Sequence, residues 1–149
     1  MNSRLKICLC LVGLLLSSFQ SSQHGDLTVI ASGIRNSNGE VNFNLFNRAD
    51  GFPSEVSNAL QHLRGKISNG TSSVIFKNIP FGKYAIAVYH DENNDSKLNK
   101  SWYGRPTEGV GISNNAKGHF APPTFGQAKF DFNAQSKTQL ITINYTFEP

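Results

Sequence analysis

The sequence predicts an all-β domain, an antiparallel Greek-key β-sandwich of six to seven strands with one short helix. Apolar and polar residues alternate in several short segments, as they do in strands with one buried face. Turn signals rich in glycine, proline and asparagine separate these segments at intervals of roughly ten residues. Only one stretch has helical spacing of its apolar residues. This combination is typical of a sandwich with a single helical excursion.

The first two strands are expected at residues 27–33 and 40–46. The first (LTVIASG) is rich in β-branched residues, which favour extended backbone. In the second (EVNFNLF), apolar residues occupy alternate positions, which are Val41, Phe43 and Leu45, with Asn42 and Asn44 between them. Residues 36–39 (NSNG) form a turn signal, so the two strands are predicted to pair as a hairpin.

The helix is expected after the turn at residues 49–53 (ADGFP). Proline suits a first helical turn, and apolar residues follow at helical spacing, namely Val56, Ala59, Leu60 and Leu63. Gly65 would end the helix. We expect it to lie across one end of the sheet.

Residues 71–79 and 85–89 are expected to be the next two strands, joined by the turn NIPFGKY at 78–84. Proline fixes φ there, and Gly82 would permit a positive φ. The turn therefore predicts a tight crossover between antiparallel strands.

Residues 91–127 form a long segment without strong periodicity, and its aromatic residues predict that it is ordered. Two strands, at 129–132 and 138–147, are expected to close the domain. In the last strand two sets of side chains are expected to face opposite ways. One set is Leu140, Thr142, Asn144 and Thr146, and the other is Ile141, Ile143, Tyr145 and Phe147.

Residues 1–22 have the parts of a secretory signal peptide. Arg4 and Lys6 precede a short apolar run at 7–16, and small polar residues follow it. The run is about half of the roughly 20 residues that span a bilayer. Cleavage is expected between Ser18 and Gln23; a buried strand, a retained anchor or a lipoprotein lipidated at Cys10 are the alternatives. The prediction is an exported protein, periplasmic or secreted, with one domain at 26–149 and no membrane span after leader removal.

Both cysteines, Cys8 and Cys10, lie in the leader, so the mature chain has no disulfide and no thiol chemistry. Removing the leader cations Arg4 and Lys6 lowers the formal net charge from +4 to +2. The remaining Lys and Arg are not clustered, which argues against nucleic-acid binding.

Several motifs together resemble DUF2141, a family of uncharacterised exported bacterial proteins. They are GFP at 51–53, IPFGKY at 79–84, AVYHDEN at 87–93, PTEG at 106–109, GISNNAKG at 111–118 and FAPPTF at 120–125. The resemblance covers roughly residues 26–147. It implies a small, exported, β-rich protein without an assigned activity. The P-x-G-x-Y turn is also similar to turns of transthyretin-like and collagen-binding B-type sandwich domains, which is an analogy of fold only.

The acidic stretch after His90 predicts a candidate calcium site. Asp and Asn alternate in the register of an EF-hand loop, and a carbonyl would follow at the seventh position. The expected ligands are Asp91, Asn93, Asp95, the Lys97 carbonyl, Asn99 and, in place of the missing twelfth-position carboxylate, Glu108. Ser96 stands where such loops have glycine, and binding is expected to be weak. The alternative is an Asx-rich turn bonded to its own backbone, without metal.

Two further sets of residues suggest different functions. His90, Glu108 and His119 are candidates for an acid–base site of a small envelope hydrolase or lyase. A binding surface for a protein, peptide or sugar would use exposed aromatic, cationic and imidazole side chains, which are His90, Trp102, Tyr103, Arg105 and His119. Packing is the favoured role of Phe120 and Phe125, and for Trp102 and Tyr103 packing and binding are equal alternatives. No metal-ligand spacing of histidines and no nucleophile motif is present, so a non-catalytic binding or structural module is the predicted function, with calcium as the candidate cofactor.

Overall fold

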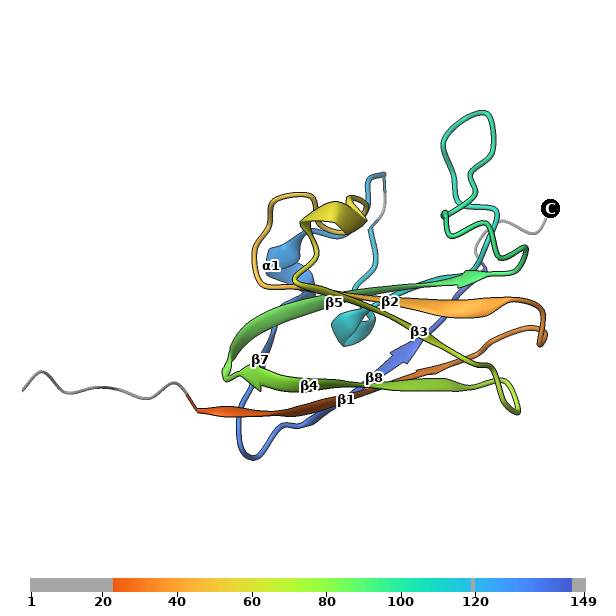
Figure 1. The fold of residues 1–149 in the computed structure, drawn as a ribbon. Helices are drawn as coiled ribbons and strands as arrows, with labels where there is room; N and C mark the ends of the chain where they lie inside the picture. The colour runs from red at the N-terminus through yellow and green to blue at the C-terminus, as the bar shows by residue number, and fades with distance from the viewer. Residues whose placement is uncertain (1–22, 119, 146–149) are drawn as a thin grey trace, which may run out of the picture.

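The computed structural model describes residues 23–118 and 120–145, which form two β-sheets packed face to face (Figure 1). The first sheet has the order β4-β1-β8, with strands β1 (His24–Ser32), β4 (Ser72–Pro80) and β8 (Thr138–Thr142). The second has the order β3-β2-β5-β6, with strands β2 (Glu40–Phe46), β3 (Gln61–Gly65), β5 (Gly82–Asp91) and β6 (Val110–Ile112). A short strand, β7 (Phe130–Phe132), pairs with the start of β5.

The predicted all-β sandwich is confirmed, with two differences. The described residues hold eight strands rather than six or seven, and β1 pairs with β8 in parallel rather than antiparallel. The predicted signal peptide (1–22), His119 and residues 146–149 lie outside the described residues. Within the described residues, no helix has the length and apolarity that crossing a membrane requires.

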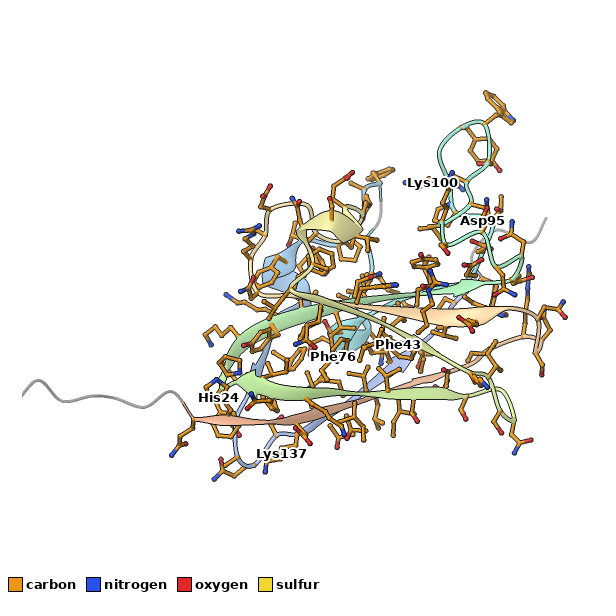
Figure 2. The ribbon with its side chains drawn as sticks, in the orientation of Figure 1. His24, Phe43, Phe76, Asp95, Lys100 and Lys137 are labelled. Atoms are coloured by element: carbon orange, nitrogen blue, oxygen red, sulfur yellow. The ribbon has the colours of Figure 1, made fainter. Side chains whose placement is uncertain are left out.

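The core lies between the two sheets, where alternate side chains of both sheets meet. Phe43 of β2 and Phe76 of β4 lie in this layer (Figure 2). Fully or almost fully buried with them are Leu27, Val29, Leu45, Ile79, Ile86, Val88, Phe132 and Ile141. Each such side chain contributes about 1.5–3 kcal/mol relative to an exposed one. The last strand, β8, ends at Thr142 rather than continuing to 147, but the predicted alternation holds there, because Ile141 and Ile143 are buried and Leu140 is exposed.

The predicted hairpin between the first two strands is wrong. β1 pairs with β4 and β8, whereas β2 pairs with β3 and β5, so residues 36–39 carry the chain from one sheet to the other. A turn motif specifies a local reversal, but partner choice depends on distant strands. The second face of β2 is also buried, because Asn42 and Asn44 are 0% and 1% exposed.

The predicted helix over residues 53–65 is also wrong. The segment forms a single 3-10 turn, η1 (Val56–Asn58), and then strand β3, which pairs with β2. Val56 and Leu60, expected on the buried helical face, are 36% and 43% exposed. Leu63 fits period two as well as helical spacing, and pairing with β2 satisfies the backbone groups of both strands.

The helix that the structure does contain is α1 (Phe125–Ala128). Its signal in the sequence is a capping box, in which the Thr124 hydroxyl accepts from the Gln127 backbone N–H and the Gln127 side chain accepts from the Thr124 N–H. Buried Ser113, in the 3-10 turn η2 (Ser113–Asn115), donates to the Ala128 carbonyl at 2.7 Å and accepts from Ile86 N–H at 2.9 Å. Ser113 thereby joins strand β5 to the end of α1.

The crossover between β4 and β5 passes from one sheet to the other at Pro80–Gly82. The Tyr84 hydroxyl donates to the Pro80 carbonyl at 2.7 Å, and Phe81 packs edge-on against Phe132. The positive φ expected at Gly82 is instead at Asn78 (54°), whose N–H donates to Asp26. Asn78 lies within β4, opposite the register shift between Gly25 and Leu27, so this positive φ belongs to a β-bulge before the crossover.

Candidate functional site: an acidic loop and the cleft beside it

The acidic loop, residues 92–108, leaves the sheet at Asp91, the last residue of β5. The Asp91 side chain is 2% exposed, and its two carboxylate oxygens accept the backbone N–H groups of Asp95 at 3.1 Å and Ser96 at 2.8 Å. The amide of Asn42 on β2 lies 3.5 Å from the same carboxylate. Asp91 therefore fixes the first turn of the loop to the sheet.

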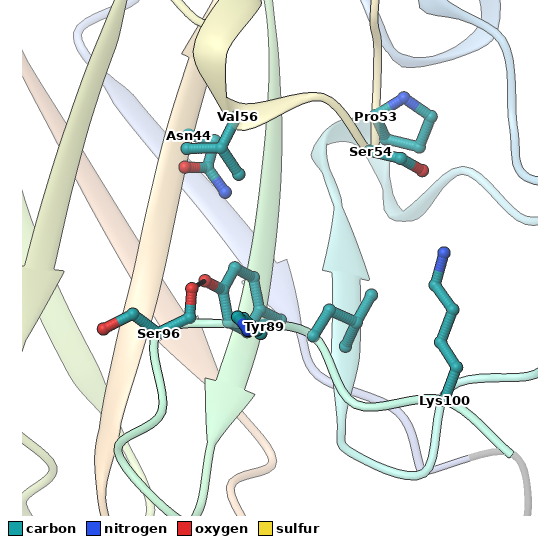
Figure 3. Close-up of a pocket in the computed structure, with 9 residues that line it drawn as sticks. Asn44, Pro53, Ser54, Val56, Tyr89, Ser96 and Lys100 are labelled. Carbon is teal, nitrogen blue, oxygen red and sulfur yellow. Dashed lines mark hydrogen bonds between the residues drawn. The ribbon is translucent and has the colours of Figure 1, made fainter.

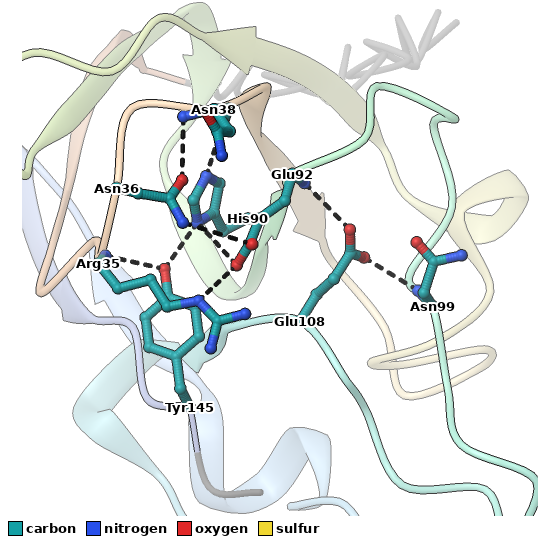
Figure 4. Close-up of polar contacts among 8 residues, drawn as sticks. All are labelled: Arg35, Asn36, Asn38, His90, Glu92, Asn99, Glu108 and Tyr145. Carbon is teal, nitrogen blue, oxygen red and sulfur yellow. Dashed lines mark hydrogen bonds and ion pairs between the residues drawn. The ribbon is translucent and has the colours of Figure 1, made fainter. Parts of the chain in front are cut away.

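Glu108 holds the other end of the loop (Figure 4). It is 7% exposed, and its two oxygens accept the backbone N–H groups of Glu92 and Asn99, each at 3.0 Å. Burial raises the pKa of Glu108, while these two hydrogen bonds act in the opposite direction. One carboxylate thus ties the beginning, middle and end of the loop together.

Asp95 organises the outer turn. One of its oxygens accepts the Lys97 backbone N–H at 2.9 Å, and the other accepts the side-chain amides of Asn93 and Asn99 at 3.2 and 2.9 Å. The hydrogen bond from Asn99, followed by that from the Lys97 backbone, lowers the pKa of Asp95. Asn94 and Ser96 have positive φ values of 58° and 64°, so the chain is tightly wound without a glycine.

The residues expected to bind calcium are therefore gathered in one loop, but the side-chain oxygens of Asp91, Asn93, Asp95 and Glu108 accept hydrogen bonds from the chain itself. Among the residues that the structure describes, no group of three or more His, Cys, Asp or Glu side chains is placed to hold a metal ion. The geometry corresponds to the alternative, an Asx-rich turn bonded to its own backbone. Calcium binding stays a prediction.

His90, expected on a binding surface, is 0% exposed, because β5 is an interior strand of its sheet. Its Nε2 lies 2.7 Å from the Asn38 carbonyl, which only accepts, so this nitrogen carries a hydrogen. Its Nδ1 lies 2.7 Å from the Tyr145 hydroxyl and 3.6 Å from Glu92 (Figure 4). Both ring nitrogens of His90 therefore have hydrogen-bond partners within the protein. His119 lies outside the described residues, so its distance from His90 and Glu108 stays untested.

Glu92 lies beside His90 and is partly buried. Arg35 Nε donates to it at 2.7 Å, and the Asn36 amide lies 3.4 Å away. Burial would raise the pKa of Glu92, but the hydrogen bonds from Arg35 and Asn36 outweigh it, and the pKa is lowered. The Arg35 guanidinium also lies over the Tyr145 ring, 4.5 Å from its centroid.

The tip of the acidic loop exposes two aromatic rings. Trp102 is 96% exposed and Tyr103 57%, and their centroids are 5.2 Å apart in an edge-on contact. The Arg105 guanidinium lies 6.0 Å from the Tyr103 centroid. The Arg105 carbonyl accepts the Ser101 N–H at 2.7 Å, which closes the tip. These three residues are at the surface, as a binding role requires.

The two phenylalanines expected to pack behave differently. Phe125 packs edge-on against Phe52, with centroids 5.9 Å apart. Phe120 is fully exposed, so the prediction that it packs is wrong. Nothing in the structure explains its exposure.

A cleft of about 290 Å³ lies beside the acidic loop, and no sequence pattern predicts it. It separates the loop from residues 47–60, the segment between β2 and β3 (Figure 3). Its lining residues are Asn44, Pro53, Ser54, Val56, Tyr89, Ser96, Lys97, Leu98 and Lys100. From the alternation in residues 40–46, Asn44 is expected on the solvent-facing side of its strand. No local pattern in the sequence shows that two loops cover that side.

Asn44 and Tyr89 come from the neighbouring strands β2 and β5 and form the sheet side of the cleft. The Tyr89 hydroxyl donates to the Ser96 carbonyl at 3.1 Å, and burial, followed by the nearby Asp91, raises its pKa to about 12. The phenol is therefore neutral at physiological pH. Asn44 Oδ1 accepts from His62 Nδ1 at 2.7 Å.

Comparison with known proteins gives one family. The model of the family described as "Uncharacterized protein conserved in bacteria (DUF2141)" matches residues 29–140. It is the family that the sequence motifs resemble. No curated protein and no solved structure matches the chain.

Proposed function

The chain belongs to the DUF2141 family of uncharacterised bacterial proteins, and from its own geometry we propose that it is an exported, non-catalytic module that binds a saccharide. The acidic loop and the adjacent cleft would form the binding site. One observation carries the proposal: a loop braced at both ends by buried carboxylates exposes Trp102 almost fully at its tip and lines a cleft with Lys97, Leu98 and Lys100.

The exposed aromatic pair supports a binding role because a large ring in water leaves its apolar surface unused by the fold. Trp and Tyr rings each offer a broad apolar face together with a polar atom. The C–H face of a pyranose ring stacks on such a surface, while its hydroxyl groups remain free for hydrogen bonds. A loop that is already ordered loses less conformational entropy on binding than a mobile one.

The cleft supports a small polar ligand. Its volume, about 290 Å³, is near the lower end of the range for small-molecule sites, roughly 300–1,000 Å³. A stable protein partner would need about 800 Å² of surface on each side. A sugar ring fits the combination of the Tyr89 ring with the amide and hydroxyl groups of Asn44, Ser54 and Ser96 in the lining.

The non-catalytic part of the proposal is supported by where the titratable groups point. His90 is fully buried and bonded at both nitrogens, and the carboxylates of Asp91 and Glu108 accept backbone N–H groups. A general acid or base has to reach the proton that it transfers.

Export is supported by the basic start and apolar run of residues 1–22.

Trp102 is the only tryptophan of the chain, so its fluorescence reports on the tip of the acidic loop directly. The test is a titration with neutral, acidic and amino oligosaccharides and with mixed peptides. We expect a blue shift of Trp102 emission with at least one saccharide class. A response to peptides alone, or to none of the saccharides, would contradict saccharide binding.

The matched variants are Trp102→Ala with Tyr103→Ala, and Leu140→Ala as control, compared by calorimetry because the first pair removes the fluorophore. Leu140 is 66% exposed and lies on the other sheet. Binding should be lost in the double variant and kept in the control. Equal binding by both would remove the loop tip from the site.

A further inference from the structure

We infer that the cleft is selective for acidic saccharides, with the carboxylate of a uronate ring held by Lys97 and Lys100. This inference rests on the proposed saccharide-binding function and names the class of sugar. Its starting point is the charge of the cleft: the nine lining residues include two lysines and no carboxylate.

Both lysines are available to a ligand. Lys97 and Lys100 are exposed, and neither forms an ion pair with any of residues 23–118 and 120–145. Figure 3 shows Lys100 extending from the acidic loop toward Pro53 and Ser54 on the opposite wall. Its ammonium group therefore points across the cleft rather than out along the loop.

The nearby carboxylates form no ion pair with either lysine within the described residues, although the charge of Lys97 acts on Asp95 and the charges of Asp91, Glu108 and Asp95 act on Tyr89. Asp91 and Glu108 are buried at the base of the loop, and their oxygens accept backbone N–H groups. Asp95 turns its oxygens toward the Lys97 backbone and the Asn93 and Asn99 amides. The hydrogen-bonding capacity of these carboxylates is used inside the loop, whereas the two lysine ammonium groups form no ion pair within the described residues.

The rest of the lining provides what a sugar ring needs besides its charge. Asn44 is 1% exposed and lines the cleft, and its Oδ1 is already bonded to His62. Its amide NH₂ can therefore donate to a ligand hydroxyl. Tyr89, Val56 and Leu98 add aromatic and aliphatic surface for the ring's C–H groups. The volume suits a single ring rather than a longer segment buried whole.

The experiment is a calorimetric titration at low ionic strength with three tetrasaccharides: tetragalacturonate, its fully methyl-esterified form and neutral maltotetraose. The ester keeps the ring and removes the charge. We expect tetragalacturonate to bind about tenfold more tightly than its ester, a difference that corresponds to about 1.4 kcal/mol. Added salt should weaken the binding of the acid and not that of the ester.

The decisive variant is Lys97→Ala with Lys100→Ala, and the control is Lys77→Ala with Lys137→Ala, which changes the net charge equally. Lys77 and Lys137 are exposed on the side of the molecule formed by the β4-β1-β8 sheet. The first pair should lose the preference for acid over ester, and the control should keep it.

The two hypotheses fail in different ways. Equal affinity for tetragalacturonate and its ester, or a preference that survives in the Lys97/Lys100 variant, would overturn the acidic-sugar inference and leave saccharide binding intact. Absence of tetragalacturonate binding together with binding of maltotetraose would do the same. Absence of binding to all three, and to the wider panel read by Trp102, would overturn both.

Discussion

Asp91 and Asp95 stand four residues apart in the chain, but their surroundings differ. Asp91 is buried at the end of β5, where it accepts two backbone N–H groups and faces the Asn42 amide. Asp95 lies in water, and its bonds hold only the outer turn. Removing a buried acceptor leaves its hydrogen-bond donors without a partner. Removing an exposed acceptor costs less, because water takes its place.

We therefore expect Asp91→Ala to lower the free energy of unfolding by about 2–4 kcal/mol, since several donors lose a charged, buried acceptor. Asp95→Ala should have a clearly smaller effect. Urea denaturation followed by circular dichroism measures both. Equal losses in the two variants would show that burial of Asp91 does not matter to the loop.

Glu92 makes stability depend on pH with a defined sign. Its pKa in the folded protein lies below the ordinary value of 4.5, because the hydrogen bonds from Arg35 and Asn36 outweigh the effect of burial. The folded state then binds fewer protons than the unfolded chain near that pH. The stabilisation is present above pH 4.5 and is lost as the pH falls through the folded pKa.

Glu92→Gln should therefore lower stability at pH 7 by about 1 kcal/mol, the upper part of the range for partly exposed ion pairs. It should also make the fall in stability below about pH 5 shallower than in the wild type. Chemical denaturation at several pH values between about 3 and 7 gives the comparison. Parallel pH profiles for the two proteins would argue against the assigned role of Glu92.

At the scale of the elements, the turn between β1 and β2 contacts the base of the acidic loop. Gly39 has a φ of 66°, and a Cβ there would lie 1.7 Å from the Asp91 carbonyl oxygen. Gly104, at the tip of the loop, has a φ of 83°, and no atom lies within 4 Å of the place that a Cβ would take. The two glycines have the same backbone requirement but very different neighbours.

Gly104→Ala should cost about 1–2 kcal/mol, the strain of a positive φ in a residue with a side chain. Gly39→Ala should cost at least about 3 kcal/mol, because overpacking against the backbone adds to the same strain. Thermal and urea unfolding of the pair give the difference. Similar losses would mean that the turn moves away from Asp91 without cost.

What could be predicted from the sequence depended on how local each feature is. Alternation in residues 40–46 predicts a strand with a buried face, and the capping box at Thr124–Gln127 is a readable helix signal. The helix expected over residues 53–65 failed because Leu63 fits both periods, and pairing of β3 with β2 decides between them. The hairpin failed for the same reason: NSNG specifies a turn, but β1 finds its partners in β4 and β8.

At the scale of the whole molecule, both loops stand on the same side of the sandwich. Figure 1 shows residues 47–60 and the acidic loop on the face of the β3-β2-β5 sheet that points away from the β4-β1-β8 sheet. This arrangement covers Asn42 and Asn44, which a half-buried strand would leave in water. The composition of the acidic loop is readable from its residues, but the cleft arises only when two segments distant in the sequence face each other, so no local pattern encodes it.

The same arrangement bears on calcium. The acidic loop is held by hydrogen bonds from its own backbone and amides to Asp91, Asp95 and Glu108, so its order does not require an ion. A calcium ion would need six to eight oxygen ligands and would have to displace several of these bonds. We therefore expect the midpoint of thermal unfolding to be the same in EDTA and in about 10 mM calcium, well above the affinity range of weak extracellular sites. The opposite outcome would be a higher unfolding midpoint in calcium that is lost in Asp95→Ala and kept in the matched variant Asp131→Ala on β7. That outcome would establish the metal site that the Asp and Asn spacing predicts.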